Sequence, residues 1–64
     1  MTLIINGETK SVPLKTLQEL LSHYKISPDQ VIIEHNKTLY KTPFPKINFQ
    51  ENDTIEIIQF MGGG

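Results

Sequence analysis

The stretch TLIINGETKSV, residues 2–12, sets the start of the fold. Its first four residues are mostly large apolar or β-branched, which favours a strand. Asn6-Gly7 follows, and Asn-Gly between two such runs is the strongest short-range signal for a two-residue hairpin turn. Thr9 to Val12 forms the returning strand, and Pro13 ends it because proline has no N–H to give to a strand ladder. The sequence therefore predicts a β-hairpin at its start.

A short helix is predicted directly after this hairpin. Thr16 and Glu19 have the spacing of a capping box, in which each side chain accepts a hydrogen bond from the backbone of the other. Ser27-Pro28 ends the helix, because the residue before a proline avoids the helical region. We expect the helix at about residues 17–25. Its apolar stripe has helical spacing and consists of Leu17, Leu20, Leu21 and Tyr24.

Three further strands are expected in the second half of the chain. Val31-Ile32-Ile33 begins a strand that ends near His35-Asn36, Thr38 to Lys41 forms a brief return, and Thr54 to Phe60 forms a strong last strand. Residues 42–50 contain two prolines and are the least regular part. Their large apolar side chains are expected to pin this segment to the core, and they are Phe44, Ile47 and Phe49.

The order strand, strand, helix, strand, short strand, strand predicts an α+β domain. A hairpin followed by a crossing helix suits a mixed four- to five-stranded sheet with the helix packed on one face. This is the β-grasp, or ubiquitin-like, arrangement. We expect the domain to span residues 1–61, followed by a flexible glycine tail at residues 62–64.

Composition excludes several classes of function. The 64 residues include no cysteine, so no disulfide, thiol nucleophile or side-chain persulfide is available. The net charge is −1, with six lysines and no arginine, whereas a nucleic-acid-binding domain usually has a basic footprint. No apolar run reaches the roughly 20 residues that cross a membrane, and no secretory signal pattern is present. We therefore expect a soluble cytoplasmic protein without nucleic-acid or membrane partners.

Alternation along the last strand predicts which side chains leave the core. Ile55 and Ile57 fall on one face, and Glu56, which is costly to bury, falls on the other. The face with Glu56 is therefore the open one. An apolar cluster on that face is expected to bind a partner, and its members are Ile4, Ile58 and Phe60, with Met61 beside them. Alternatively, residues 42–50 fold over this face and bury it.

The tail Gly62-Gly63-Gly64 carries the chemistry that we expect of this chain. Glycines add no side chain, so they form a thin arm that can enter a narrow active site. The arm would end in the Gly64 carboxylate, which is anionic at neutral pH. Such a carboxylate can attack the α-phosphate of ATP on a partner enzyme and become an acyl-adenylate. A glycine tail on its own is also compatible with an expression remnant or with simple terminal disorder.

Other candidate sites are weak. His23, His35 and Glu34 could together approach a metal, but solvent-exposed histidines are the better interpretation, because a catalytic zinc site normally needs three protein ligands. No nucleophile–base pair is recognisable. We therefore predict no metal, no bound cofactor and no enzymatic activity of the chain itself.

Over essentially its whole length the chain resembles the ThiS family, the sulfur carriers of thiamine biosynthesis. The resemblance rests on four segments, of which the last is the specific one. They are Leu3 to Gly7, Thr16 to Leu21, Val31 to Asn36, and Asp53 to Gly64.

This resemblance implies a reaction cycle centred on Gly64. A ubiquitin-activating-type (ThiF-like) enzyme would use ATP to adenylate its carboxylate, and sulfur from a cysteine desulfurase route would convert it to a thiocarboxylate. A ThiG-like thiazole synthase would then take that sulfur for the thiazole ring. Gly63 matches the other glycine of the family's diglycine end, and Gly62 extends the arm.

Three alternatives remain open at this point. The chain could be the small subunit of molybdopterin synthase, another β-grasp sulfur carrier ending in Gly-Gly, although those chains are generally longer. It could be a ubiquitin-like modifier that forms isopeptide bonds with lysines. It could also be a plain interaction domain with an inert tail.

Overall fold

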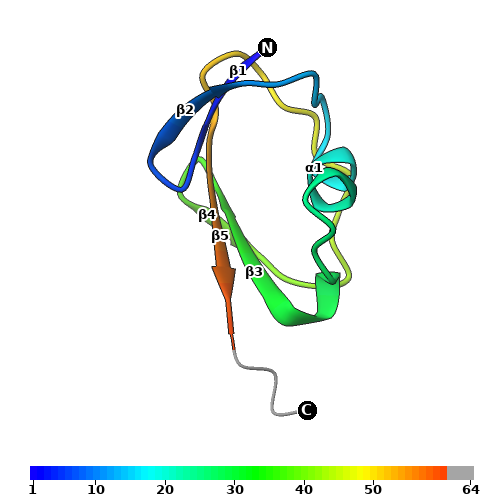
Figure 1. Ribbon diagram of the computed structural model, residues 1–64. Helices are drawn as coiled ribbons and strands as arrows, with labels where there is room; N and C mark the ends of the chain where they lie inside the picture. The colour runs from blue at the N-terminus through cyan, green and yellow to red at the C-terminus, as the bar shows by residue number, and fades with distance from the viewer. Residues whose placement is uncertain (61–64) are drawn as a thin grey trace.

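The computed structural model describes residues 1–60 as one five-stranded sheet with one α-helix on one of its faces (Figure 1). The strand order is β2-β1-β5-β3-β4. β1 and β5 run parallel, and the other neighbours are antiparallel. The predicted β-grasp architecture is confirmed. The elements are β1 (Thr2–Ile5), β2 (Glu8–Ser11), α1 (Leu17–His23), a 3₁₀ turn (Pro28–Gln30), β3 (Val31–His35), β4 (Thr38–Tyr40) and β5 (Thr54–Gln59).

The hairpin and the helix form as their local sequence predicts. Asn6 and Gly7 have φ values of 52° and 82°, the positive angles that a tight hairpin turn between two strands requires. At the start of α1, Thr16 Oγ1 accepts from Glu19 N–H at 3.1 Å, and Glu19 Oε1 accepts from Thr16 N–H at 3.2 Å. The capping box is therefore present. The helix ends at His23, two residues earlier than expected, and Lys25 follows with a φ of 56°.

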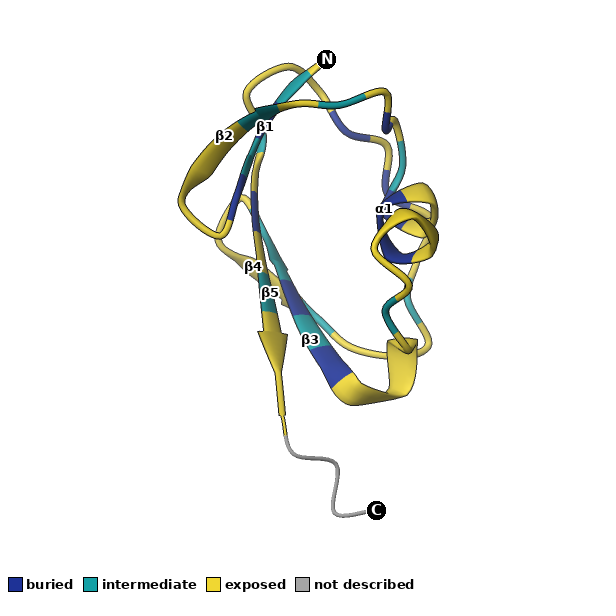
Figure 2. Cartoon of the chain, in the orientation of Figure 1, coloured by how far each residue is buried: buried dark blue, intermediate teal, exposed yellow. Residues whose placement is uncertain are grey.

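The core lies between α1 and one face of the sheet. Figure 2 shows the buried residues of α1 turned toward the strands. The three central strands, β1, β5 and β3, each contribute side chains to this core, and so does the segment between β4 and β5. The buried apolar side chains are Leu3, Ile5, Leu14, Leu17, Leu20, Leu21, Val31, Ile33, Ile47, Phe49 and Ile55.

The segment from residue 42 to residue 50 packs on the helix side of the sheet. Leu17 N–H donates to the Ile47 carbonyl at 2.9 Å, and Phe49 N–H donates to the Lys15 carbonyl at 2.7 Å. Both Ile47 and Phe49 are buried, as expected, and Phe44 packs partly against the core. The segment therefore runs beside α1 (Figure 1), and the alternative that it covers the opposite face of the sheet is wrong.

Candidate functional site: the open face and free edge of β5

β5 occupies the centre of the sheet and leads toward the glycines. It pairs with β1 on one side and with β3 on the other. Figure 1 shows its C-terminal end leaving the sheet at the end opposite the N-terminus. Met61 and Gly62-Gly63-Gly64, which we singled out from the sequence, lie outside the described residues. The described part of the site is thus the surface around the end of β5.

The two faces of β5 differ as alternation predicts. Ile55 is fully buried beneath α1, and Ile57 is partly buried on the same face. On the other face Glu56 is exposed, and Ile58 and Phe60 keep 44% and 45% of their surface exposed. The prediction of an open face that carries large apolar groups is confirmed.

The antiparallel register between β3 and β5 brings further apolar groups to this face. Ile58 lies directly opposite Ile32, and Phe60 N–H continues the ladder by donating to the Gln30 carbonyl at 3.1 Å. Leu39 on β4 is 62% exposed, and it lines a shallow hollow together with Ile32. We call the set Ile32, Leu39, Ile58 and Phe60 the open-face patch.

Ile4 does not belong to this patch, which corrects the expected cluster. It pairs with Thr54, four residues before Ile58 along β5, or about 13 Å at the rise of a strand. Glu56 stands on the same face between the two positions. Ile4 instead lines a separate hollow with Thr54 and Glu56. A role of Phe60 and Ile58 in binding a partner stays a prediction, whereas the expected role of Ile4 loses the cluster on which it rested.

Sequence reasoning missed Ile32 and Leu39. The run Val31-Ile32-Ile33 alternates across a strand, so its middle residue had to face away from the core if its neighbours were buried. That signal was available for Ile32. The position of Leu39 depends on which residue of β3 it opposes, and the structure places it opposite Glu34.

An acidic pair borders the open-face patch. Glu34 and Glu56 are directly opposite one another on β3 and β5. Within residues 1–60 neither carboxylate takes part in an ion pair. Like charges at directly opposed positions repel, so the pair weakens the sheet slightly. The open face is therefore apolar toward the end of β5 and anionic farther from it.

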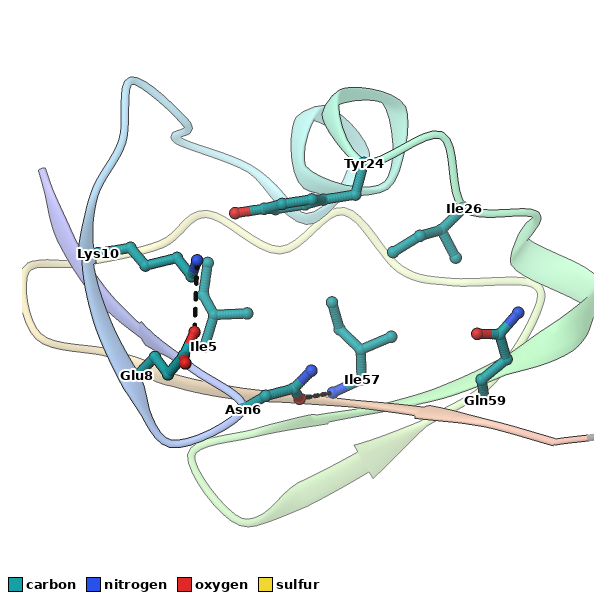
Figure 3. Close-up of a pocket in the computed structure, with 8 residues that line it drawn as sticks. All are labelled: Ile5, Asn6, Glu8, Lys10, Tyr24, Ile26, Ile57 and Gln59. Atoms are coloured by element: carbon teal, nitrogen blue, oxygen red, sulfur yellow. Dashed lines mark hydrogen bonds and ion pairs between the residues drawn. The ribbon is translucent and has the colours of Figure 1, made fainter.

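A groove lies on the helix side of the same strand. Its walls come from β5, the β1–β2 hairpin and the residues after α1, and its volume is about 320 Å³ (Figure 3). Ile57 and Ile5 form the apolar floor, and Tyr24 and Ile26 face them. The exposed Lys10–Glu8 ion pair on its rim, with 3.5 Å between Nζ and Oε1, contributes little to stability.

The two histidines have separate surroundings. His35 Nε2 is 2.7 Å from Asp53 Oδ2, at the end of the sheet away from the C-terminal end of β5. His23 is the last residue of α1, and its ring makes an edge-to-face contact with the Tyr24 ring, with centroids 4.8 Å apart. Among the residues that the structure describes, no group of three or more metal-binding side chains gathers. The sequence hypothesis of a His23, His35 and Glu34 metal site therefore has no geometric support.

The carboxyl of Asp53 organises the loop before β5. Partial burial tends to raise the pKa of Asp53, but hydrogen bonds from His35, the Gln50 N–H and Asn36 outweigh it and hold this pKa below its ordinary value. The same cluster ties the β3–β4 turn to the start of β5, since Asn36 Oδ1 accepts from Thr54 N–H at 2.9 Å. Its role is to hold the far end of the sheet together.

Comparisons with known proteins agree on one family. The family model described as "ThiS family" matches residues 3–64. The sulfur carrier protein ThiS of Bacillus subtilis (strain 168) is 38% identical over 50 residues, which span 77% of this chain and 76% of that protein. A crystal structure of the thiamine biosynthesis protein (ThiS) from Geobacter metallireducens superposes with a TM-score of 0.77 at 32% identity, covering all of both chains.

A relative of another kind extends this picture. The thiazole synthase of Magnetococcus marinus (strain ATCC BAA-1437 / JCM 17883 / MC-1) is 33% identical over 66 aligned positions, which cover the whole of this chain but only 20% of that protein. In residues 1–60 the structure contains no helix of the length and apolarity needed to cross a bilayer. The family model, the relatives and the fold lead to one conclusion: this chain belongs to the ThiS family.

Proposed function

We propose that this chain is the sulfur carrier for the thiazole ring of thiamine, and that it carries sulfur on the carboxyl group of Gly64. The observation that carries the proposal is membership of the ThiS family over residues 3–64. It also favours thiamine over the molybdopterin alternative. In this proposal residues 1–61 form the folded handle, and residues 62–64 form the arm that partner enzymes act upon.

The chemistry follows from the poor reactivity of a carboxylate. A Gly64 carboxylate oxygen attacks the α-phosphorus of ATP on a ubiquitin-activating-type enzyme, which forms an acyl-adenylate and releases pyrophosphate. A persulfide supplied through a cysteine desulfurase then attacks the acyl carbon through its outer sulfur, and AMP leaves, which gives an acyl disulfide. A second thiol then attacks the sulfur of the persulfide carrier, so that the carrier leaves as a new disulfide with this thiol and Gly64 keeps the other sulfur as a thiocarboxylate. The absence of cysteine supports this assignment, because no side-chain thiol competes for the sulfur.

The partners fit the surfaces described above. The open-face patch is the docking surface for the adenylating enzyme, since it is apolar and borders the strand that leads to Gly64. A thiazole synthase of the ThiG type is the acceptor of the sulfur. Support for this second partner comes from relatives named thiazole synthase, in which about a fifth of the length resembles this chain.

The chain acts in the cytoplasm as a protein co-substrate rather than as an enzyme. It binds no cofactor of its own, and ATP is consumed by the adenylating partner. Nothing in residues 1–60 pairs a nucleophile with a base, because the one close contact of a histidine with an acid joins His35 to Asp53 at the far end of the sheet.

Intact-mass analysis tests the proposal. The purified chain is incubated with the adenylating enzyme from the same genome, ATP and a cysteine desulfurase with cysteine. We expect the mass gain for exchange of one oxygen for sulfur, and we expect none for a variant lacking Gly62-Gly63-Gly64. The thiocarboxylated chain is then offered separately to thiazole synthase and to the large subunit of molybdopterin synthase.

Three outcomes would overturn the proposal. A chain that gains no sulfur is not a carrier. Turnover by molybdopterin synthase alone would assign the carrier to that pathway. Conjugates between Gly64 and lysines of other proteins would identify a modifier instead.

A further inference from the structure

β5 has a free backbone edge beyond the point where β1 ends. β1 pairs with β5 at only two positions, Ile4 with Thr54 and Ile5 with Ile55. The chain then turns away through Asn6-Gly7, whose φ values are both positive. β5 continues for four more residues, so within residues 1–60 its second half has a neighbouring strand on the β3 side and none on the other (Figure 1).

The hydrogen bonds already present show which groups point to this free side. Thr54 and Phe60 face β3, since the Thr54 carbonyl accepts from Asn36 N–H and Phe60 N–H donates to the Gln30 carbonyl. The residues between them alternate. Ile55 faces β1, because its carbonyl accepts from Asn6 N–H at 2.9 Å. By the same alternation, the N–H and C=O of Gln59 point toward the space that β1 leaves empty.

The Asn6 side chain marks where the pairing stops. Ile57 N–H donates to Asn6 Oδ1 at 2.8 Å (Figure 3). This amide oxygen takes the place of the backbone carbonyl that a longer β1 would have offered. Beyond it, the Ile57 carbonyl and both backbone groups of Gln59 have no hydrogen-bond partner within residues 1–60. Three backbone groups on the same side of β5 are thus available to form hydrogen bonds with another strand.

The groove of Figure 3 borders this edge on the helix side. Ile57 and Gln59 line it together with Tyr24 and Ile26. A strand added beside β5 would turn alternate side chains toward α1, and the groove is where the first of them would lie. Recognition by strand addition combines these two features: backbone hydrogen bonds supply affinity, and a pocket for alternate side chains supplies specificity.

We propose that the edge from Ile57 to Gln59 binds an extended segment of the adenylating enzyme that activates Gly64, added to the sheet in the space where β1 stops. The inference rests on the proposed function. The segment presents backbone N–H and C=O groups to Gln59 and Ile57 and an apolar side chain to the groove. Pairing there fixes the direction of the chain that leads to Gly64, while the open-face patch holds the opposite face of the same strand.

Gln59→Pro tests this edge because it removes one N–H and no β3 ladder bond. Ile58, which precedes it, is extended in β5 as a residue before proline prefers, so we expect an unchanged melting temperature. Loss of the N–H donor, together with the bulk of the proline ring, should raise the Kd for the adenylating enzyme by about tenfold or more. Gln59→Ala keeps the N–H and should raise the Kd less than Gln59→Pro does.

Thr9→Pro is the matched proline control. Val12 N–H donates to the Met1 carbonyl, so by alternation the Thr9 N–H points away from β1 to the outer edge of the sheet. We expect Thr9→Pro to bind the adenylating enzyme as the unmodified chain does. Amide exchange gives a second readout, since the Gln59 N–H should become protected in the complex.

The outcomes separate this inference from the proposed function. If the unmodified chain gains sulfur and Gln59→Pro binds the adenylating enzyme as tightly as Gln59→Ala does, that enzyme does not use the edge and the carrier function stands. If the unmodified chain gains no sulfur, the carrier function itself fails. A concentration-dependent dimer of the unmodified chain that Gln59→Pro abolishes would show that a second copy pairs with this edge, which would overturn a partner segment.

Discussion

Asp53 is the residue that most directly couples stability to pH. Its carboxylate accepts from His35, Asn36 and the Gln50 N–H, with Oδ2 at 2.7 Å from His35 Nε2 and 2.9 Å from Gln50 N. These bonds favour the charged form, which lowers the pKa of Asp53 in the folded state despite partial burial. A group whose folded pKa is depressed contributes stability above its unfolded pKa and loses it as pH falls.

Asp53→Asn should therefore lower the free energy of unfolding at pH 7 by about 1.5–3 kcal/mol, the range for hydrogen bonds to a charged group. The difference from the unmodified chain should shrink as pH falls below about 4, where the unfolded Asp takes up a proton. Urea titrations between pH 7 and pH 3 measure it. A difference that stays constant over this range would show that the charge of Asp53 contributes no stability.

Within the open-face patch, Phe60 is the residue whose substitution should weaken partner binding much more than it lowers the stability of the fold. Its side chain is 45% exposed, so Phe60→Ala should change the free energy of unfolding by less than about 1 kcal/mol. We expect the Kd for the adenylating enzyme to rise by about tenfold or more, as for aromatic anchors of interfaces. Calorimetry gives the Kd, and thermal melts give the stability.

Ile4→Ala is the control for this experiment, because Ile4 lies near Thr54 rather than near Ile58. It should leave the Kd nearly unchanged. Equal losses of affinity in Ile4→Ala and Phe60→Ala would mean that the docking surface extends along the whole of β5.

At the scale of elements, local signals predicted the structure well. The Asn6-Gly7 turn and the Thr16–Glu19 capping box each depend on residues within a few positions of one another, so sequence alone was enough. The membership of the open-face patch depends on something else, the register between β3, β4 and β5. Sequence reasoning could assign a face to Ile4 but could not tell that pairing with Thr54 places it a long way from Ile58.

The packing of residues 42–50 shows the same limit. Its apolar residues predicted contact with the core, and Ile47 and Phe49 are buried. Hydrophobicity alone could not tell whether the segment packs on the helix side of the sheet or on its open face. The bonds of Leu17 N–H to the Ile47 carbonyl and of Phe49 N–H to the Lys15 carbonyl decide it, and both span some thirty residues of sequence.

The β3–β4 turn offers a test at the same scale. Asn36 and Lys37 have φ values of 50° and 76°, which makes Lys37 a lysine in a backbone region that favours glycine. Lys37→Gly should raise the free energy of unfolding by about 1 kcal/mol. Chemical denaturation measures the change.

The β1–β2 turn provides the reciprocal control. Gly7 has a φ of 82°, and a Cβ added there would meet nothing within 4 Å. Gly7→Lys should therefore destabilise the chain by a similar amount through backbone strain alone. Changes of the same sign in both variants would contradict this account.

At the scale of the whole molecule, the stability of the fold depends mainly on a small core. Among the described residues 1–60, eleven buried apolar side chains form the core, and the chain has no cysteine with which to form a disulfide. A domain of this length has a free energy of unfolding of roughly 3–10 kcal/mol. Each core side chain therefore accounts for a large share of the stability.

Leu20→Ala should remove about 3 kcal/mol, since Leu20 is fully buried on α1. We expect the urea midpoint to fall steeply, with part of the chain unfolded at 37 °C. Leu39→Ala, at a side chain that is 62% exposed on the open face, is the matched control and should shift the midpoint little. Similar shifts for the two variants would show that the core is not located where burial places it.

The central position of β5 also has a consequence for biosynthesis. Within the described sheet, β5 is the strand that joins the β1–β2 hairpin to the β3–β4 hairpin, and it is the last strand in the order of the chain. During translation the two hairpins have emerged before their common neighbour exists, so the sheet closes only when residues 54–59 leave the ribosome. A nascent chain cut short before β5 cannot assemble this sheet, and a truncated chain is therefore exposed to proteolysis rather than competing with intact carriers for the partner enzymes.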